Sequence, residues 1–346
     1  MCVEPPTRRT FLGVAAVCLA ASLLDAQVPT AVDLGRLWNE LDDAYDAKDW
    51  PAAIRLAEQI AAASPKAPAP AFYAACVHAR AGHRDEALSW LERAAARGYA
   101  DLEMLDADPD LSADSGDARY VFARTTVARH RDAAVEEARA KARDAPVVFH
   151  VPTPADDRSP IERPLIVALH GRGSSPAVML PAFRALADAT GALLALPQAL
   201  QPYGRGYSWG SADLAEVVVL GAIESARRRA PFNTRQILLA GFSEGAWMAM
   251  RVALRHPDRV HGVMAMAGYH DERLVPGRRA EQARRLRVAL LVGGDDGNIP
   301  TNNRQAEARL KAARIPVMLR VFPNVGHHLP PNAIAEMKEA VAFLLR

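Results

Sequence analysis

The distribution of apolar and polar positions divides the chain into two parts of different character. From Leu34 to about His130 the chain reads as helix after helix, with no run of alternating β-branched residues. From Val147 onward, short apolar runs alternate with helical stretches, which is typical of a mostly parallel sheet with helices on both faces. We therefore predict an α/β domain over residues 147–346, preceded by an all-α domain. The strand-like runs are Val147–Val151, Leu165–Leu169, Ala192–Leu196, Gln236–Ala240, Val260–Met266, Val288–Val292 and Val317–Val321.

The first part contains an internal repeat. At a shift of 34 residues, Ala53 falls on Ala87 and Ile60 falls on Ala94. Small residues recur where packed helices must approach closely. Across about two units, roughly Leu34–Arg97, this pattern resembles the tetratricopeptide repeat, whose helix pairs stack by their apolar faces. The resemblance implies a helical repeat domain over residues 31–130.

The segment after these two units is predicted to close the helical domain. Tyr120 and Phe122 would cap its last apolar face, and a charged linker helix over residues 131–146 would join the two domains. Two roles for the repeats remain open. They are a docking surface for a peptide or protein partner, or a helical appendage packed on the catalytic domain.

Residues 1–26 have the three parts of an export signal. An arginine pair at positions 8 and 9 begins the segment, an apolar run extends from Phe11 to Leu24, and Ala26 is the candidate last residue before cleavage. The string at positions 7–12 resembles a twin-arginine signal. That resemblance implies a periplasmic or secreted protein without a membrane span in its mature form, and an uncleaved membrane anchor is the alternative.

Composition narrows the choice of partners. The 42 basic and 40 acidic residues leave a formal net charge of +2, so no electrostatic case exists for a nucleic-acid partner. Of the three cysteines, Cys76 alone would remain after removal of the leader. With no metal-type cysteine spacing around it, Cys76 is predicted to be a small buried apolar residue.

A strand-to-helix junction carries the clearest chemical motif. An apolar run at 237–240 leads directly into Gly241-Phe242-Ser243-Glu244-Gly245, and a helix is predicted over Ala246–Arg255. A G-x-S-x-G pattern in this context is typical of a nucleophile on a strained turn, with glycines that let strand and helix close tightly. Ser243 is the candidate nucleophile. The backbone N–H of Glu244, at the helix N-terminus, is a candidate oxyanion donor whose side chain matters less.

Two later strands are followed by the groups that a serine nucleophile requires. The run at 288–292 leads to Asp295 and Asp296, which compete for the role of the acid that orients a histidine. After the last predicted strand, His327 directly follows a glycine and is the candidate base, with His328 as the alternative. The chain order Ser, Asp, His is that of α/β-hydrolases.

The segment after the strand at 165–169 supplies a second candidate oxyanion donor, the backbone N–H of Arg172. The Arg172 guanidinium is either a contact for an anionic substrate or a surface charge in a glycine turn. In the short loop 201–211, Tyr207 and Trp209 are candidate substrate-binding residues or, alternatively, aromatic anchors of the loop. So short a loop leaves no room for a large lid, which favours an open cleft.

Together these elements resemble the phospholipase/carboxylesterase branch of the α/β-hydrolase superfamily, and secreted polyhydroxyalkanoate-depolymerase-like and feruloyl-type esterases share the outline. The family places its acid four residues before a proline, which selects Asp296 over Asp295. The resemblance implies a serine esterase that forms an acyl-enzyme from short acyl or polymer-pendant esters, without metal or organic cofactor. A serine peptidase is one alternative, and a repeat-based binding protein with an inactive hydrolase fold is another.

Overall fold

The computed structural model describes residues 34–152, 159–270 and 280–346, so the predicted export signal lies outside the described residues. Internal contacts divide the chain into two compact units, Met1–Ala134 and Val135–Arg346. None of the helices in the described ranges combines the length and the hydropathy that a membrane crossing requires.

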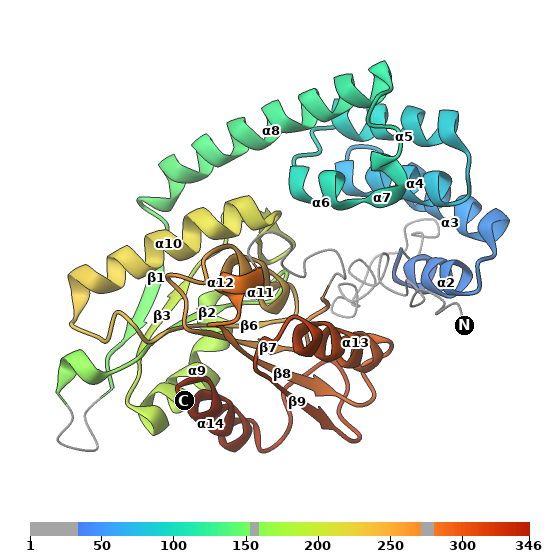
Figure 1. Ribbon diagram of the computed structural model, residues 1–346. Helices are drawn as coiled ribbons and strands as arrows, with labels where there is room; N and C mark the ends of the chain where they lie inside the picture. The colour runs from blue at the N-terminus through green and yellow to red at the C-terminus, as the bar shows by residue number, and fades with distance from the viewer. Residues whose placement is uncertain (1–33, 153–158, 271–279) are drawn as a thin grey trace, which may run out of the picture. The chain divides into compact units, whose positions relative to one another are not determined.

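The first unit is built from helices in the part that the structure describes (Figure 1). Carboxylates begin several of them, because they accept hydrogen bonds from first-turn N–H groups that have no partner within the helix. The Asp49 carboxylate accepts from the N–H of Ala52 at 3.1 Å, and Asp108 accepts from Leu111 at 2.9 Å. The helices are α2 (Leu34–Asp46), α3 (Trp50–Ala63), α4 (Pro68–Arg80), α5 (Arg84–Ala96), α6 (Leu102–Ala107), α7 (Pro109–Ser112) and α8 (Ala118–Ala142), the last of which continues into the second unit.

Positions that align at the 34-residue shift are buried in both copies. Ala53 and Ala87 are 0% exposed, and Ile60 and Ala94 are at most 1% exposed. These side chains belong to α3 and α5, both of which pack against α4. Burial at equivalent positions is what a stacked repeat requires, while the tetratricopeptide identity of the unit stays a prediction.

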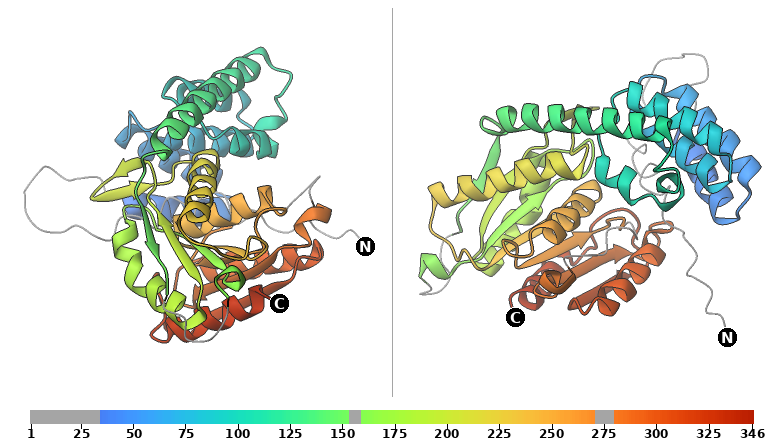
Figure 2. Two further views of the ribbon diagram at one scale, coloured as in Figure 1. Left: turned by 90° about the vertical axis from the view of Figure 1, so that its left-hand side faces the viewer. Right: turned by 45° about the horizontal axis from the view of Figure 1, so that its top comes forward.

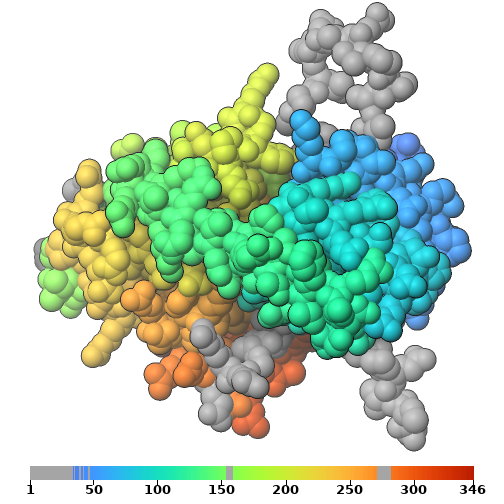
Figure 3. Space-filling model, turned by 90° about the horizontal axis from the view of Figure 1, so that it is seen from above, coloured from blue at the N-terminus to red at the C-terminus, as the bar shows by residue number. Residues whose placement is uncertain are grey.

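Helix α8 differs from the prediction in two respects. Tyr120 is 3% exposed, but Phe122 is 68% exposed, so the prediction that both cap the same apolar face is wrong. The physical reason is that residues two apart on a helix point about 200° away from each other. The helix also runs without a break through residue 130, where a linker helix was predicted to begin. Residues of α8 form the green band that faces the viewer in Figure 3.

The second unit is built around a sheet with the strand order β1-β3-β2-β6-β7-β8-β9 among the described residues (Figures 1 and 2). Every neighbouring pair is parallel except β1 and β3, which are antiparallel. The prediction of a mostly parallel sheet with flanking helices is therefore confirmed. The strands are β1 (Val147–His150), β2 (Leu165–Leu169), β3 (Leu193–Pro197), β6 (Ile237–Phe242), β7 (Gly262–Met266), β8 (Arg287–Gly293) and β9 (Val317–Phe322).

Apolar side chains alternate along the strands and give the sheet two buried faces. On β2, Ile166 and Ala168 share a core with residues of α9 (Pro176–Thr190) and α14 (Ala333–Leu344). The intervening β2 residues are equally buried, and α10 (Ala212–Arg229) and α11 (Glu244–Arg255) contact the sheet from the opposite face, as Figure 1 shows. The remaining helical elements are η1 (Pro160–Glu162), α12 (Ala280–Ala283) and α13 (Ile299–Ala312).

Candidate active site

Ser243 lies between β6 and α11 in a strained backbone conformation. Its φ of 56° and ψ of −122° are rarely adopted by L-residues. The turn is so tight that a Cβ on Gly241 would lie 2.3 Å from the carbonyl carbon of Gly245. A Cβ on Gly245 would in turn lie 2.4 Å from the carbonyl oxygen of Leu169. Only glycine fits at either position, so the two glycines of the motif are required by this turn.

The turn is held at the edge of the sheet by backbone interactions. The N–H of Ser243 donates to the carbonyl of Met266 on the neighbouring strand at 2.9 Å. Ser243 is the N-cap of α11, so the first N–H groups of that helix, including the N–H of Glu244, have no acceptor within the helix. The helix N-terminus also carries partial positive charge. This end of α11 is therefore suited to stabilise negative charge on an oxygen beside Ser243.

His327 and Asp296 form a hydrogen-bonded pair. Nδ1 of His327 lies 2.9 Å from Oδ2 of Asp296, whose residue is 7% exposed. Since the carboxylate accepts this bond, the His327 proton lies on Nδ1 and Nε2 is left as a proton acceptor. The ring centroids of His327 and Phe242, the residue before Ser243, are 5.1 Å apart. The competing carboxylate, Asp295, is exposed, whereas the one bonded to the imidazole, Asp296, is buried.

The loop after β2 passes directly beside the nucleophile turn. A Cβ on Gly171 would lie 3.5 Å from the Cβ of Ser243. His170, which is 1% exposed, holds this loop because its Nε2 accepts from the N–H of Ala199 at 3.2 Å and its Nδ1 donates to the carbonyl of Gly171 at 2.8 Å. Burial lowers the pKa of His170, which keeps the ring neutral and able to both donate and accept.

A hairpin that the sequence analysis missed holds the same loop. It consists of β4 (Gln201–Tyr203) and β5 (Gly206–Ser208), strands too short to show a periodic pattern. The N–H of Gly173 donates to the carbonyl of Tyr207 at 2.9 Å, and the N–H of Tyr207 donates to the carbonyl of Ser174 at 3.0 Å. A Cβ on Gly206 would lie 2.4 Å from the carbonyl oxygen of Gly173. Tyr207 thus supports the loop through its backbone, and its substrate-binding role stays a prediction.

Trp209 is buried against the same loop. It is 2% exposed, its Nε1 donates to the carbonyl of His170 at 2.7 Å, and the two rings lie 5.0 Å apart. These contacts are those of an aromatic anchor, one of the two interpretations of Trp209. Its role in substrate binding stays a prediction.

The side chains of Arg172 and Glu244 meet, a contact that the sequence analysis did not anticipate. Nε of Arg172 donates to Oε1 of Glu244 at 3.1 Å, and the Arg172 guanidinium carbon lies 5.7 Å from the centroid of the Tyr203 ring. The guanidinium is therefore engaged by a buried carboxylate, a role that neither interpretation of Arg172 included. No pattern in the sequence signals this pair, because its partners are 72 positions apart.

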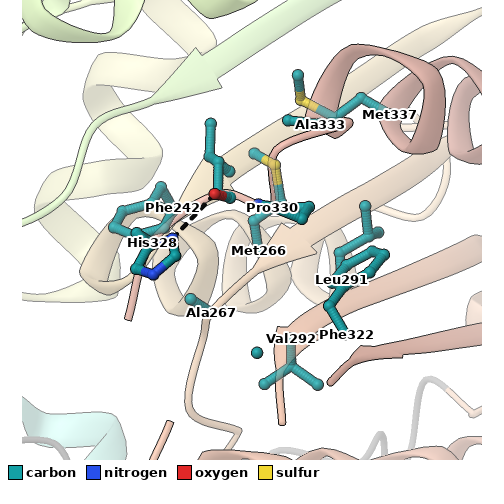
Figure 4. A pocket seen from close by; sticks show the side chains of 12 residues that line it. Phe242, Met266, Ala267, Leu291, Val292, Phe322, His328, Pro330, Ala333 and Met337 are labelled. Atoms are coloured by element: carbon teal, nitrogen blue, oxygen red, sulfur yellow. Dashed lines mark hydrogen bonds between the residues drawn. The ribbon is translucent and has the colours of Figure 1, made fainter. Parts of the chain in front are cut away.

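A shallow apolar hollow lies beside the histidine loop (Figure 4). His328 lines it, with Nδ1 3.0 Å from the carbonyl oxygen of Leu329, and so takes no part in the pair with Asp296. Phe242, the residue before Ser243, also lines this hollow. The other large side chains that line it are those of Met266, Leu291, Phe322, Leu329, Pro330 and Met337.

In the described ranges, no three His, Cys, Asp or Glu side chains gather as a metal site would require. Cys76 is 3% exposed, which confirms the prediction that it is a small buried residue.

The second unit is similar in sequence to known proteins. Residues 222–345 match the phospholipase/carboxylesterase family model, a segment that contains Ser243, Asp296 and His327 but not the loop after β2. NocK of Nocardia uniformis subsp. tsuyamanensis, which carries a provisional esterase name, is 33% identical over 130 residues, 34% of this chain and 36% of that protein. Mouse (Mus musculus) lysophospholipase-like protein 1 is 29% identical over 107 residues, 30% of this chain and 44% of that protein.

The chain therefore spans less than half the length of these two relatives. A crystal structure of the Bacillus cereus carboxylesterase superposes with a TM-score of 0.48 at 16% identity, covering 60% of this chain and 99% of that one. The mostly parallel sheet with its flanking helices fits an α/β-hydrolase fold, and residues 222–345 of this unit are similar to the phospholipases and carboxylesterases.

Proposed function

We propose that the protein is a serine carboxylesterase in which Ser243 is the nucleophile, His327 the general base and Asp296 the acid that orients the histidine. One observation carries this proposal. The His327–Asp296 hydrogen bond lies at the same edge of the sheet as the strained Ser243 turn, and Phe242 contacts the His327 ring. An imidazole held by a buried carboxylate is the group that activates a serine hydroxyl.

In the proposed reaction, Nε2 of His327 takes the proton from the Ser243 hydroxyl while Oγ attacks the ester carbonyl carbon. Negative charge then develops on the carbonyl oxygen, and the backbone N–H groups of Arg172 and Glu244 donate to it. His327 returns the proton to the leaving alcohol, which gives an acyl-enzyme. Water, deprotonated by the same imidazole, then attacks the acyl carbon. The bond from this carbon to Oγ breaks, the imidazolium returns the proton to Ser243, and the acid is released.

The proposed substrates are short acyl esters or esters that hang from a polymer. The segment between β3 and α10 holds only the small β4–β5 hairpin, which supports an open cleft without a large lid.

Two further parts of the proposal concern the remainder of the chain. The leader at 1–26 would direct the protein to the periplasm or outside the cell, and cell fractionation tests this destination. The first unit would be a tetratricopeptide-like module that binds a peptide or protein, and the buried repeat positions support a stacked helical array. Retention of cell-extract proteins on the wild-type chain but not on variants of this unit tests that role.

Labelling with a fluorophosphonate probe, read by intact mass, tests the proposed nucleophile. We expect a single adduct on the wild-type protein and none on Ser243→Ala, which should keep its fold by circular dichroism and its midpoint of thermal unfolding within a few degrees. An unlabelled but folded wild-type protein would instead favour a binding role for the hydrolase fold.

A further inference from the structure

The carboxylate of Glu244 is buried next to the nucleophile. Its side chain is 3% exposed, and an ionised carboxylate removed from water is destabilising unless it is paired and hydrogen-bonded. Here Oε1 accepts from Oγ of Ser208 at 2.8 Å and from Nε of Arg172 at 3.1 Å. Oε2 accepts from the N–H of Trp209 at 3.3 Å.

These donors come from separate segments of the chain. Arg172 is in the loop after β2, and Ser208 and Trp209 end the hairpin that supports this loop. Glu244 itself begins α11, directly after Ser243. One carboxylate therefore joins the nucleophile turn to the loop and to the support of that loop.

The two proposed oxyanion donors, the backbone N–H groups of Arg172 and Glu244, belong to the same two residues whose side chains form this ion pair. The distance between the two loops that present these N–H groups is thus set by the side-chain pair. Displacing a reactive group by about 1 Å costs on the order of 10² in rate, and losing one oxyanion donor costs about 10²–10³.

We propose that the Glu244 carboxylate is a positioning residue for the oxyanion site: it fixes the loop after β2 against the nucleophile turn through Arg172 and Ser208. This inference rests on the proposed esterase function. The Arg172 guanidinium also has an electrostatic role in this inference, because it neutralises the charge of the Glu244 carboxylate, which would otherwise repel the developing oxyanion.

Steady-state hydrolysis of p-nitrophenyl acetate by the full chain tests the inference, with active sites counted by fluorophosphonate labelling. We expect Glu244→Ala to lower kcat about 10²-fold and to change KM by less than about threefold. Glu244→Gln keeps an acceptor for Ser208 and Arg172, so it should recover at least about tenfold of that loss. A purely structural role would lower the unfolding midpoint while leaving kcat per labelled site within about twofold of wild type, and that result would overturn the proposal.

The charge can be tested separately with a double-mutant cycle. Arg172→Met leaves the Glu244 carboxylate unneutralised beside the oxyanion, whereas Arg172→Met combined with Glu244→Gln does not. We expect the double variant to have a higher kcat than Arg172→Met alone. If the loss of kcat in the double variant equals the product of the losses in the two single variants, the charge argument is wrong.

Asp213→Asn is a matched control on another carboxylate–arginine pair of this unit. Asp213 on α10 bonds to Arg255 at 3.0 Å, and Arg255 lies at the opposite end of α11 from Ser243. We expect the control to lower the unfolding midpoint without lowering kcat more than about twofold. Inactive wild-type protein would refute the proposed function itself, whereas active wild-type protein with fully active Glu244→Ala would refute only the positioning role.

Discussion

Asn substitution at the two adjacent aspartates separates the catalytic acid from its neighbour. Asp296→Asn replaces the carboxylate that accepts the 2.9 Å bond from Nδ1 of His327. The new amide is nearly the same size, so packing is preserved, but it can donate to Nδ1 and thereby move the imidazole proton to Nε2. His327 would then have no lone pair for the Ser243 proton.

The expected loss follows from the geometry of this pair. A hydrogen bond to a charged group contributes about 1.5–3 kcal/mol, and Asp296 is too buried for water to replace it. That contribution alone corresponds to about 10–150-fold in rate, and the wrong tautomer raises the loss toward the order of 10⁴ found when a triad aspartate becomes asparagine. We therefore expect kcat of Asp296→Asn to fall about 10³–10⁴-fold, close to 4–5 kcal/mol in activation free energy.

Asp295→Asn is the control, because Asp295 is exposed and contributes to the turn through its backbone N–H, which donates to the carbonyl of Val325 at 2.9 Å. Its kcat should stay within about twofold of wild type. The assay is initial-rate ester hydrolysis, with unfolding curves for both variants. If Asp296→Asn keeps a tenth or more of the wild-type kcat, or if Asp295→Asn loses as much activity, the assignment of the acid is wrong.

Two further predictions concern the frame around this site. A Cβ introduced by Gly245→Ala would lie 2.4 Å from the carbonyl oxygen of Leu169 and 2.5 Å from that of His170, so the loop after β2 must shift. We expect kcat to fall at least about 10²-fold and the free energy of unfolding, measured in urea, to fall by about 1–3 kcal/mol. Unchanged values of both quantities would contradict the close packing. Burial, together with the nearby Arg309, lowers the pKa of His270 to about 3. A folded-state pKa below the unfolded value of about 6.5 means that stability is complete above that value and is lost as the pH falls, by about 2 kcal/mol at pH 5. His270→Gln should remove that part of the pH dependence between pH 7.5 and 5, and an identical dependence in the variant would refute the cause.

Most strands of the second unit could be predicted from the sequence because each depends on a short run of apolar residues. The apolar runs that become β2 and β8 match the observed strands to within a residue or two at each end, since buried strands need continuous apolar residues. The hairpin β4–β5 was missed because three-residue strands carry no period. Phe122 does not share the buried face of Tyr120 because two residues along a helix turn the side chain about 200° away from that face.

The candidate site divides in the same way. Ser243, Asp296 and His327 could be named as candidates in advance because each lies in the segment that follows a predicted strand, and parallel strands bring their carboxyl ends to one edge of the sheet. His327 bonds to Asp296, the aspartate that the spacing rule selects, while the catalytic role of this aspartate stays a prediction. The environment of Glu244 could not be foreseen, since its partners at 172, 208 and 209 are distant along the chain.

Local features could thus be predicted from the sequence. Periodic apolar runs indicate strands and helices, and the glycines flanking a serine indicate a turn with no room for a Cβ at either glycine. Contacts between distant segments required the folded chain, because a hydrogen bond or ion pair depends on distances of about 3 Å that no residue pattern specifies. The orientation of β1, the support of the loop after β2 by the hairpin, and the burial of the Glu244 carboxylate all belong to that second kind. Each follows from how the strands and helices pack against one another, which is a property of the whole unit rather than of any single segment.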